Sequence, residues 1–226
     1  MTLFRIAVVT TLLSPVYILL VFGAFVYAPA AHGGIFMNGA LPAITLFIGW
    51  YWLSESISIR QLSGVLLILT GAVLAAADTA QLAIGPSWLG DLMFLAGGIF
   101  FSGNLVVGRL WNITTSQVLL CSSVINAVFF VPVWYLLLPT GIPEASNDQL
   151  MLQVLYQGLI PGLIGLLLVA TAARNIGSSA TAAFMASVPA LGTVLSMIYL
   201  GEFPGTLGWI SLFILTPGIL IVALSK

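Results

Sequence analysis

Eight long apolar stretches, each long enough to cross a lipid bilayer, occupy almost the whole of this 226-residue chain. A membrane-spanning helix needs about 20 mostly apolar residues. Charged residues and turn signals divide the chain into stretches of roughly 9–31, 35–53, 60–77, 87–110, 116–138, 150–173, 180–200 and 206–224. Runs such as Val65–Leu69 lack the alternation of a barrel strand. We therefore expect an all-α, polytopic helical membrane protein with eight transmembrane helices.

The scarcity of charge limits what this chain can bind. Charged residues make up 5% of the chain and its net charge is −1, whereas a soluble domain carries about 25% charged residues. This composition excludes a soluble enzyme, and the lack of a basic patch excludes nucleic acid as a partner. The expected partners are the lipid bilayer and a small-molecule solute, and a homodimer is left open.

The sequence carries no motif that points to catalysis. It has one histidine and one cysteine, so no His–Glu–x–x–His motif and no Cys/His cluster is present to hold a metal ion. A phosphate-binding glycine loop ending in Lys–Ser or Lys–Thr is also absent. We expect no enzyme activity, no catalytic residue, no metal site and no cofactor.

Capping boxes mark the start of three of the predicted helices. In this motif a Ser or Thr and a Gln or Glu three residues later satisfy free backbone N–H groups at a helix start. The pairs are Ser58 with Gln61, Thr114 with Gln117 and Ser146 with Gln149.

The positions of the cations predict the orientation of the chain. With eight spans, all five cations fall on one side of the membrane: Arg5, Arg60, Arg109, Arg174 and Lys226. The other side receives Asp78, Glu144, Asp148 and Glu202. By the positive-inside rule, both termini are expected to be cytoplasmic, in the cell membrane.

A weak internal repeat relates the two ends of the chain. Pro42 and Glu55 have counterparts in Pro189 and Glu202 at one offset (189 − 42 = 147 and 202 − 55 = 147), and Gly71 matches Gly218 at the same offset. Spans 1 to 3 thus correspond to spans 6 to 8, and the odd displacement of five helices inverts the second copy. We expect an incomplete first repeat of three helices in 1–80 and a second repeat of five helices in 86–226. Truncation, a misplaced start and a natural variant are all left open.

The residues around this repeat resemble a known family. Ala31–His32–Gly33, Leu41–Pro42 and Leu53–Ser54–Glu55, and later Pro189 and Leu200–Gly201–Glu202, look like the EamA-type repeat of the drug/metabolite transporter superfamily. The resemblance implies ten helices in two inverted five-helix repeats, of which this chain lacks the first two. It also implies transport of small metabolites or drugs, including efflux, by alternating access between the repeats. The alternative is a truncated, non-transporting membrane protein with a packing or regulatory role.

Polar and helix-breaking residues inside the spans are the candidates for a substrate cavity. Paired interruptions in corresponding helices often mark a transport site, so Pro42 and Pro189 are candidates, with a packing kink as the alternative. Buried amides are expensive in a membrane and face either a cavity or a neighbouring helix. The remaining cavity candidates are Asn38, Asn104 and Gln157, with Tyr17 as an aromatic wall. Asn126 and Thr193 are further polar residues of the same kind.

Ionisable groups are candidates for coupling transport to a proton gradient. Asp91, one turn into the fourth span, is the proton-coupling candidate, although a carboxylate there also stabilises the helix dipole. His32 is expected to be a solvated residue of the turn between spans 1 and 2. Arg109 and Arg174 are expected to set topology, with an anionic substrate gate as the alternative. Gly158 and Gly162 are expected to allow close helix contact.

Overall fold

Every regular element in the described part of the chain is a helix. The structure is a computed structural model, and it describes residues 1–28, 32–54, 56–79, 87–138, 141–199 and 205–225. Among the described residues, six helical stretches are long and apolar enough to cross a membrane. The prediction of an all-α, polytopic helical membrane protein is confirmed.

The first half of the chain forms the first three predicted spans. Span 1 is α1 (Leu3–Leu12) and α2 (Pro15–Tyr27), span 2 is the π-helix η1 (Gly33–Gly39) and α4 (Leu41–Leu53), and span 3 is α5 (Ile59–Thr79).

The second half forms the other five predicted spans. Span 4 is α6 (Trp88–Leu110), and span 5 is α7 (Thr115–Leu119), the π-helix η3 (Leu120–Ile125) and α8 (Asn126–Leu137). After the 3₁₀ helix η4 (Ile142–Glu144), span 6 is α9 (Asn147–Gln153), the π-helix η5 (Val154–Gly165) and α10 (Leu166–Asn175). Span 7 is α11 (Ser178–Met185) and α12 (Val188–Tyr199), and span 8 is α13 (Thr206–Leu224).

The predicted limits of span 1, residues 9–31, were wrong. Helix begins at Leu3, and a break separates α1 from α2. The Ser14 hydroxyl accepts a hydrogen bond from the Val16 N–H at 3.2 Å, and Pro15 occupies the first turn of α2. A serine cap followed by proline is a helix start, which the surrounding apolar run obscures in the sequence.

All three predicted capping boxes form. In α7 and α9, the hydroxyls of Thr114 and Ser146 and the side chains of Gln117 and Gln149 make the reciprocal bonds. At the start of α5, the Gln61 N–H donates to the Ser58 hydroxyl at 3.1 Å and the Ser58 N–H donates to Gln61 Oε1 at 3.0 Å. These helix starts follow from local chemistry and are placed correctly from sequence.

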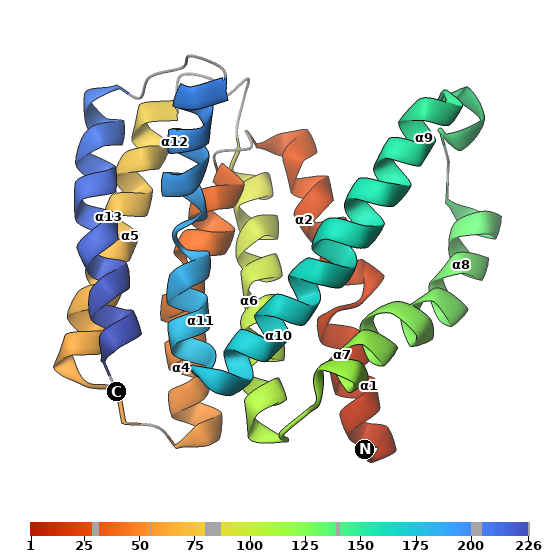
Figure 1. The fold of residues 1–226 in the computed structure, drawn as a ribbon, viewed down its shortest axis with the longest axis horizontal. Coiled ribbons are helices and arrows are strands. Elements are labelled where there is room, and N and C mark those ends of the chain that lie inside the picture. Colours follow the sequence, from red (N-terminus) through yellow and green to blue (C-terminus); the bar gives the residue numbers. More distant parts are fainter. Residues whose placement is uncertain (29–31, 55, 80–86, 139–140, 200–204, 226) are drawn as a thin grey trace.

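The closest packing in the fold joins α5 to α13, which lie side by side along their length in Figure 1. Glycines bring the two backbones together. A Cβ on Gly64 would lie 3.0 Å from the carbonyl oxygen of Gly218, and a Cβ on Gly71 would lie 3.0 Å from that of Ser211. Around this contact, buried Leu46, Ile68, Ala183, Leu215 and Val222 form one apolar core shared by α4, α5, α11 and α13.

A second apolar core surrounds the later part of α6, from Phe101 onwards. It contains buried Val9, Leu41, Leu105, Val118 and Ala182 from five different helices. In Figure 1 the two labelled ends of the chain lie at the same end of the bundle.

The helix formed by α9, η5 and α10 runs obliquely in Figure 1, with its α10 end near α6 and its α9 end farther from it. None of its most apolar window is buried. The expectation that Gly158 and Gly162 allow close helix contact was wrong for the described residues. Nothing lies within 4 Å of a Cβ on Gly158, and a Cβ on Gly162 would meet only the backbone of Gln157.

Candidate functional site

Two spans are interrupted immediately before the prolines that the repeat relates. Pro42 lies at the second position of α4, after η1 has ended at Gly39. Pro189 lies at the second position of α12, after α11 has ended at Met185. Proline is tolerated in the first turn of a helix, where its missing N–H has no partner to lose. Both prolines therefore start a new helix inside a span rather than kink a continuous one.

Polar side chains lie between α4, η1 and α6. The Thr45 hydroxyl donates to Ser102 Oγ at 3.0 Å, and both residues are fully buried. Asn38 is half-buried in η1, less than one turn before α4 begins. Within the described residues no hydrogen bond joins Asn38 to Asn104, two of the predicted cavity amides.

A small pocket opens beside Asn104, between the later part of α6, the start of α7 and the end of α10. Its cavity volume is about 20 Å³, roughly the room that one ordered water needs. Its lining residues are Asn104, Leu105, Gly108, Ile113, Val118, Ala170, Ala173 and Arg174. Only Asn104 and Arg174 among them carry polar side chains.

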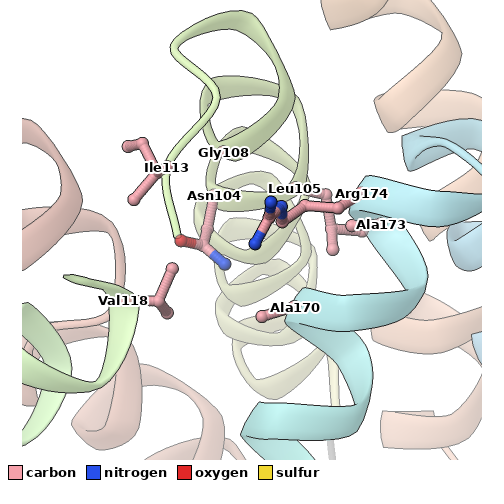
Figure 2. Close-up of a pocket in the computed structure, with 8 residues that line it drawn as sticks. All are labelled: Asn104, Leu105, Gly108, Ile113, Val118, Ala170, Ala173 and Arg174. Carbon is pink, nitrogen blue, oxygen red and sulfur yellow. The ribbon is translucent and has the colours of Figure 1, made fainter. Parts of the chain in front are cut away.

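Asn104 and Arg174 approach the pocket from different helices. Figure 2 shows the guanidinium of Arg174 reaching from α10 towards the Asn104 amide on α6. Asn104 is 6% exposed, and its Oδ1 is buried without a hydrogen-bond partner among the described residues. The pocket therefore combines a cation with an unsatisfied acceptor, surrounded by apolar walls.

Two further arginines lie near this end of α6. The Arg5 guanidinium lies over the Trp111 ring, 5.3 Å from its centroid. Arg109 lies against Gly177, because a Cβ on Gly177 would be 3.6 Å from Arg109 Nη1. Three arginine side chains, Arg5, Arg109 and Arg174, thus lie near this end of α6.

The expectation that His32 is a solvated turn residue was wrong. His32 is 7% exposed, and its Nδ1–H donates to Asp91 Oδ1 at 2.7 Å. The Ser87 hydroxyl donates to Asp91 Oδ2 at 3.3 Å, and the His32 ring lies 5.7 Å from that of Phe36. His32 Nε2 is buried without a partner among the described residues. The histidine is buried because α6 presents a carboxylate to it, a contact between residues 59 positions apart.

The remaining candidates have structural partners or lie outside the pocket. Tyr17 is half-buried and stacks on Phe101 with ring centroids 6.2 Å apart. Gln157 is exposed on η5. The Asn126 amide donates to the carbonyl oxygens of Leu13, at 3.0 Å, and of Thr10, at 3.3 Å. The side chains of Pro189 and Thr193, and residues Glu55 and Glu202, lie outside what the structure describes.

Sequence reasoning singled out Asn104 and Asp91 but gave Arg174 and His32 a minor place. The signal for Arg174 was its position at the end of a span, which also suits a topology determinant. The signal for His32 was its being the one histidine of the chain. Neither signal identifies a partner, because the partners belong to another span.

Comparison with known proteins agrees with this fold. Among the solved structures that the chain resembles is one described as a crystal structure of a protein, with a TM-score of 0.70 and 19% identity, covering 91% of this chain and 71% of the other. At that identity the similarity is one of fold. No curated protein matches the sequence. The model of the EamA-like transporter family matches residues 88–224, which is more than half of the chain. This multi-pass membrane protein therefore belongs to the EamA-like transporter family.

Proposed function

We propose that the chain transports small organic solutes across the cell membrane by alternating access between two inverted repeats, residues 1–80 and 86–226. The observation that carries the proposal is the reciprocal packing of α5 and α13. The repeat offset of 147 pairs position 64 with 211 and position 71 with 218. Gly64 meets Gly218 and Gly71 meets Ser211, so exchanging the two copies turns one contact into the other. Contacts that exchange in this way are expected around a two-fold axis.

The limits of the helices support the same pairing. Adding 147 to the first residue of α4 and of α5 gives 188 and 206, which are the first residues of α12 and α13. The two prolines then occupy the same place in each copy. Interrupted helices at corresponding positions are typical of the midplane binding sites of secondary transporters. We therefore assign Pro42 and Pro189 to the walls of the solute path, with Asn38 and Asn104 as its amides.

Two candidates take a lesser part in this proposal. Tyr17, stacked on Phe101 beside α6, supplies an aromatic wall. Gln157 faces outwards on η5 in the described fold. Its counterpart at the repeat offset lies in α1 (157 − 147 = 10), and α1 packs against α6. On η5, by contrast, Leu159 and Ile164 near Gln157 are exposed. Gln157 therefore contacts a solute only if another helix covers this part of η5.

Coupling to a proton gradient is assigned to Asp91 together with His32. The pair joins the start of η1 to the first turn of α6, so it bridges the two proposed repeats. Its side chains are 9% and 17% exposed. A proton gained or lost at this bridge changes the hydrogen bond between His32 and Asp91, and with it the contact between the repeats. The two termini lie at one end of the bundle in Figure 1, which supports the proposed orientation with both of them cytoplasmic.

Solute counterflow into liposomes tests the transport proposal. The purified full chain is reconstituted, loaded with unlabelled solutes in turn, and assayed for uptake of the same labelled solute. We expect uptake above that of protein-free liposomes for at least one small organic solute. Uptake equal to the protein-free control across sugars, nucleosides, organic acids and cationic drugs would support the non-transporting alternative instead.

The coupling proposal needs a separate measurement on the same liposomes. An imposed pH gradient is expected to accelerate uptake by the unmodified chain. Asp91→Asn and His32→Gln should remove this acceleration while counterflow without a gradient continues. Acceleration that survives in both variants contradicts the assignment of the pair to coupling.

A further inference from the structure

We propose that one exposed surface of the second repeat binds two transmembrane helices of another membrane protein, the first of which carries small residues where it crosses α10. The inference rests on the repeat that underlies the proposed function, but it concerns assembly and not transport. The surface, which we call the open face, lies on η5, α10, α11 and α12. Its residues are Leu159, Ile164, Leu168, Thr171, Asn175, Phe184 and Leu191.

The counterpart of the open face in the first repeat is covered by α6. A Cβ on Gly97 of α6 would lie 2.6 Å from Val21 Cγ2, and a Cβ on Gly103 would lie 3.0 Å from Leu12 Cδ2. Gly90 and Gly98 approach the first repeat in the same way. The atoms nearest to these four glycines belong to Leu12, Tyr17, Val21, Ala24, Ala28, Met37 and Ile44. None of these seven residues is exposed.

The repeat offset converts this covered surface into the open face. Adding 147 to the seven positions gives 159, 164, 168, 171, 175, 184 and 191, and every residue at these positions is exposed. Val21, for example, is half-buried, whereas its counterpart Leu168 is 65% exposed. Where the copies meet, burial is equal instead, since Ile68 and its counterpart Leu215 are 0% and 1% exposed. The copies therefore differ at the surface that α6 covers in only one of them.

A polar side chain distinguishes a protein partner from lipid. Gln157 is exposed near the middle of the 29-residue apolar helix Asn147–Asn175. A polar group at this depth is costly against acyl chains, and such groups face protein or a water-filled cavity as a rule. A lipid tail offers no hydrogen bond to the amide, so we assign this part of η5 to a contact with protein.

The counterpart of Gln157 indicates why two helices are needed. This counterpart is Thr10 (157 − 147 = 10), whose Oγ1 is buried. Thr10 belongs to α1, which packs against both α6 and η3. The open face thus corresponds to a surface covered by one helix, and Gln157 to a residue beside the next. The bound helices are the equivalents of spans 4 and 5.

A second copy of the chain does not offer a suitable helix. Each of the eight spans already has its place in the fold, and 61% of the most apolar window of α6 is buried. The glycines of α6 face its own first repeat, so a second copy could present them only by giving up that packing. We therefore assign the open face to a different polypeptide. Its first helix carries Gly, Ala or Ser where it meets the large side chains of Leu168 and Phe184, as α6 carries glycine.

Photocrosslinking in the membrane of the cell that naturally contains the protein tests the proposal. Benzoylphenylalanine replaces Phe184 on the open face, or Phe213 as the control. Phe213 is 80% exposed on α13, and its counterpart Leu66 is exposed as well, so neither copy is covered there. From position 184 we expect an adduct with another protein, joined within an apolar stretch of about 20 residues at a turn that contains Gly, Ala or Ser. From position 213 we expect adducts with lipid alone.

The other possible adducts contradict the proposal. Lipid adducts alone at position 184 would mean that the open face contacts the bilayer. An adduct of two copies of this chain would assign the face to a homodimer. An adduct with a water-soluble segment of another protein would also overturn the assignment to membrane helices.

Leu168→Trp and Leu66→Trp form a matched pair of variants. Both leucines are exposed in the chain alone, so neither change should shift the thermal unfolding midpoint of the purified chain. Leu168→Trp should lower the yield of the protein adduct from position 184 at least about fivefold, because the larger ring prevents close approach. Leu66→Trp should leave the yield unchanged. Equal yields in the two variants would contradict close packing at Leu168.

Gln157→Leu tests the contact assigned to the second helix. It should lower the yield of the same adduct about threefold, since a hydrogen bond between membrane helices is lost. The unfolding midpoint of the purified chain should be retained or raised, because the amide has no role in the chain alone. An unchanged yield would show that Gln157 faces lipid and would remove the second helix from the proposal.

These outcomes are independent of the transport assay. Lipid adducts alone at position 184, together with solute uptake by the purified chain, overturn this inference and leave transport in place. The expected protein adduct without uptake of any solute, by the chain alone or reconstituted with the crosslinked protein, overturns transport alone.

Discussion

Gly64 and Gly218 face each other so closely that neither position has room for a side chain. A Cβ on Gly64 would lie 3.0 Å from the carbonyl oxygen of Gly218, and a Cβ on Gly218 would lie 2.9 Å from that of Gly64. Such small residues let helix backbones approach within a membrane, where packing rather than the hydrophobic effect drives association. The reciprocal contact makes α5 and α13 the best-packed pair of helices in the fold and the natural pivot between the two proposed repeats.

Gly218→Ala is therefore expected to destabilise the protein. The added methyl group meets the Gly64 backbone and the Leu67 Cβ at 2.9 Å, and the helices must separate to admit it. We expect a loss of about 1–3 kcal/mol, as for overpacked cores, measured by SDS-induced unfolding in mixed micelles. Gly158→Ala is the control, because nothing lies within 4 Å of its Cβ. Equal stability of the two variants would show that the α5 and α13 contact is loose.

The bond between His32 and Asp91 is expected to couple η1 to α6 energetically. A double-mutant cycle with His32→Gln and Asp91→Asn should give an interaction free energy of about 0.5–3 kcal/mol. Each single variant leaves one partially buried polar group without its partner, so the double variant should lose less than the sum of the two losses. Unfolding in mixed micelles measures all four proteins, and strictly additive losses would mean that the contact contributes nothing.

The contrast between the capping boxes and the His32 contact shows what could be predicted from sequence. The start of α7 depends on Thr114 and Gln117, which are three residues apart, and this local motif was sufficient to place it. The break between α1 and α2 also has a local cause in Ser14 and Pro15, but an uninterrupted apolar run concealed it. The candidate site is different, because its polar residues meet across spans.

Long-range contacts decide which predicted site residues come together. Asp91 was selected for its position in a helix, yet its bond to His32 depends on how α6 packs against η1. Asn104 was selected as a buried amide, and the other polar side chain that lines its pocket, Arg174, lies 70 residues later in the chain (174 − 104 = 70). The internal repeat relates spans to one another but does not indicate which of their faces meet.

Asn126 is expected to stabilise the break in span 1. Its amide donates to the carbonyl oxygens of Leu13 and Thr10, which flank the point where α1 ends and α2 begins. Asn126→Leu should cost about 1–3 kcal/mol, since these carbonyl oxygens lose a donor in a region without water. Gln153→Leu, at an exposed position on α9, is the control in the same unfolding assay. A loss no larger than that of the control would mean that the two carbonyl oxygens find other donors.

Pro42→Ala and Pro189→Ala are expected to impair transport to a similar extent, because the proposed repeats place the two prolines at equivalent positions. Each proline starts a helix after an interruption, and alanine restores an N–H group that allows the two segments to join. A continuous helix removes the free backbone groups that the proposed solute path uses. We expect each variant to slow counterflow about tenfold, with an unfolding midpoint close to that of the unmodified chain. Pro217→Ala, which removes a proline from the middle of α13, provides the comparison. If it slows counterflow as much as the other two, the effect belongs to proline removal in general and not to the paired interruptions.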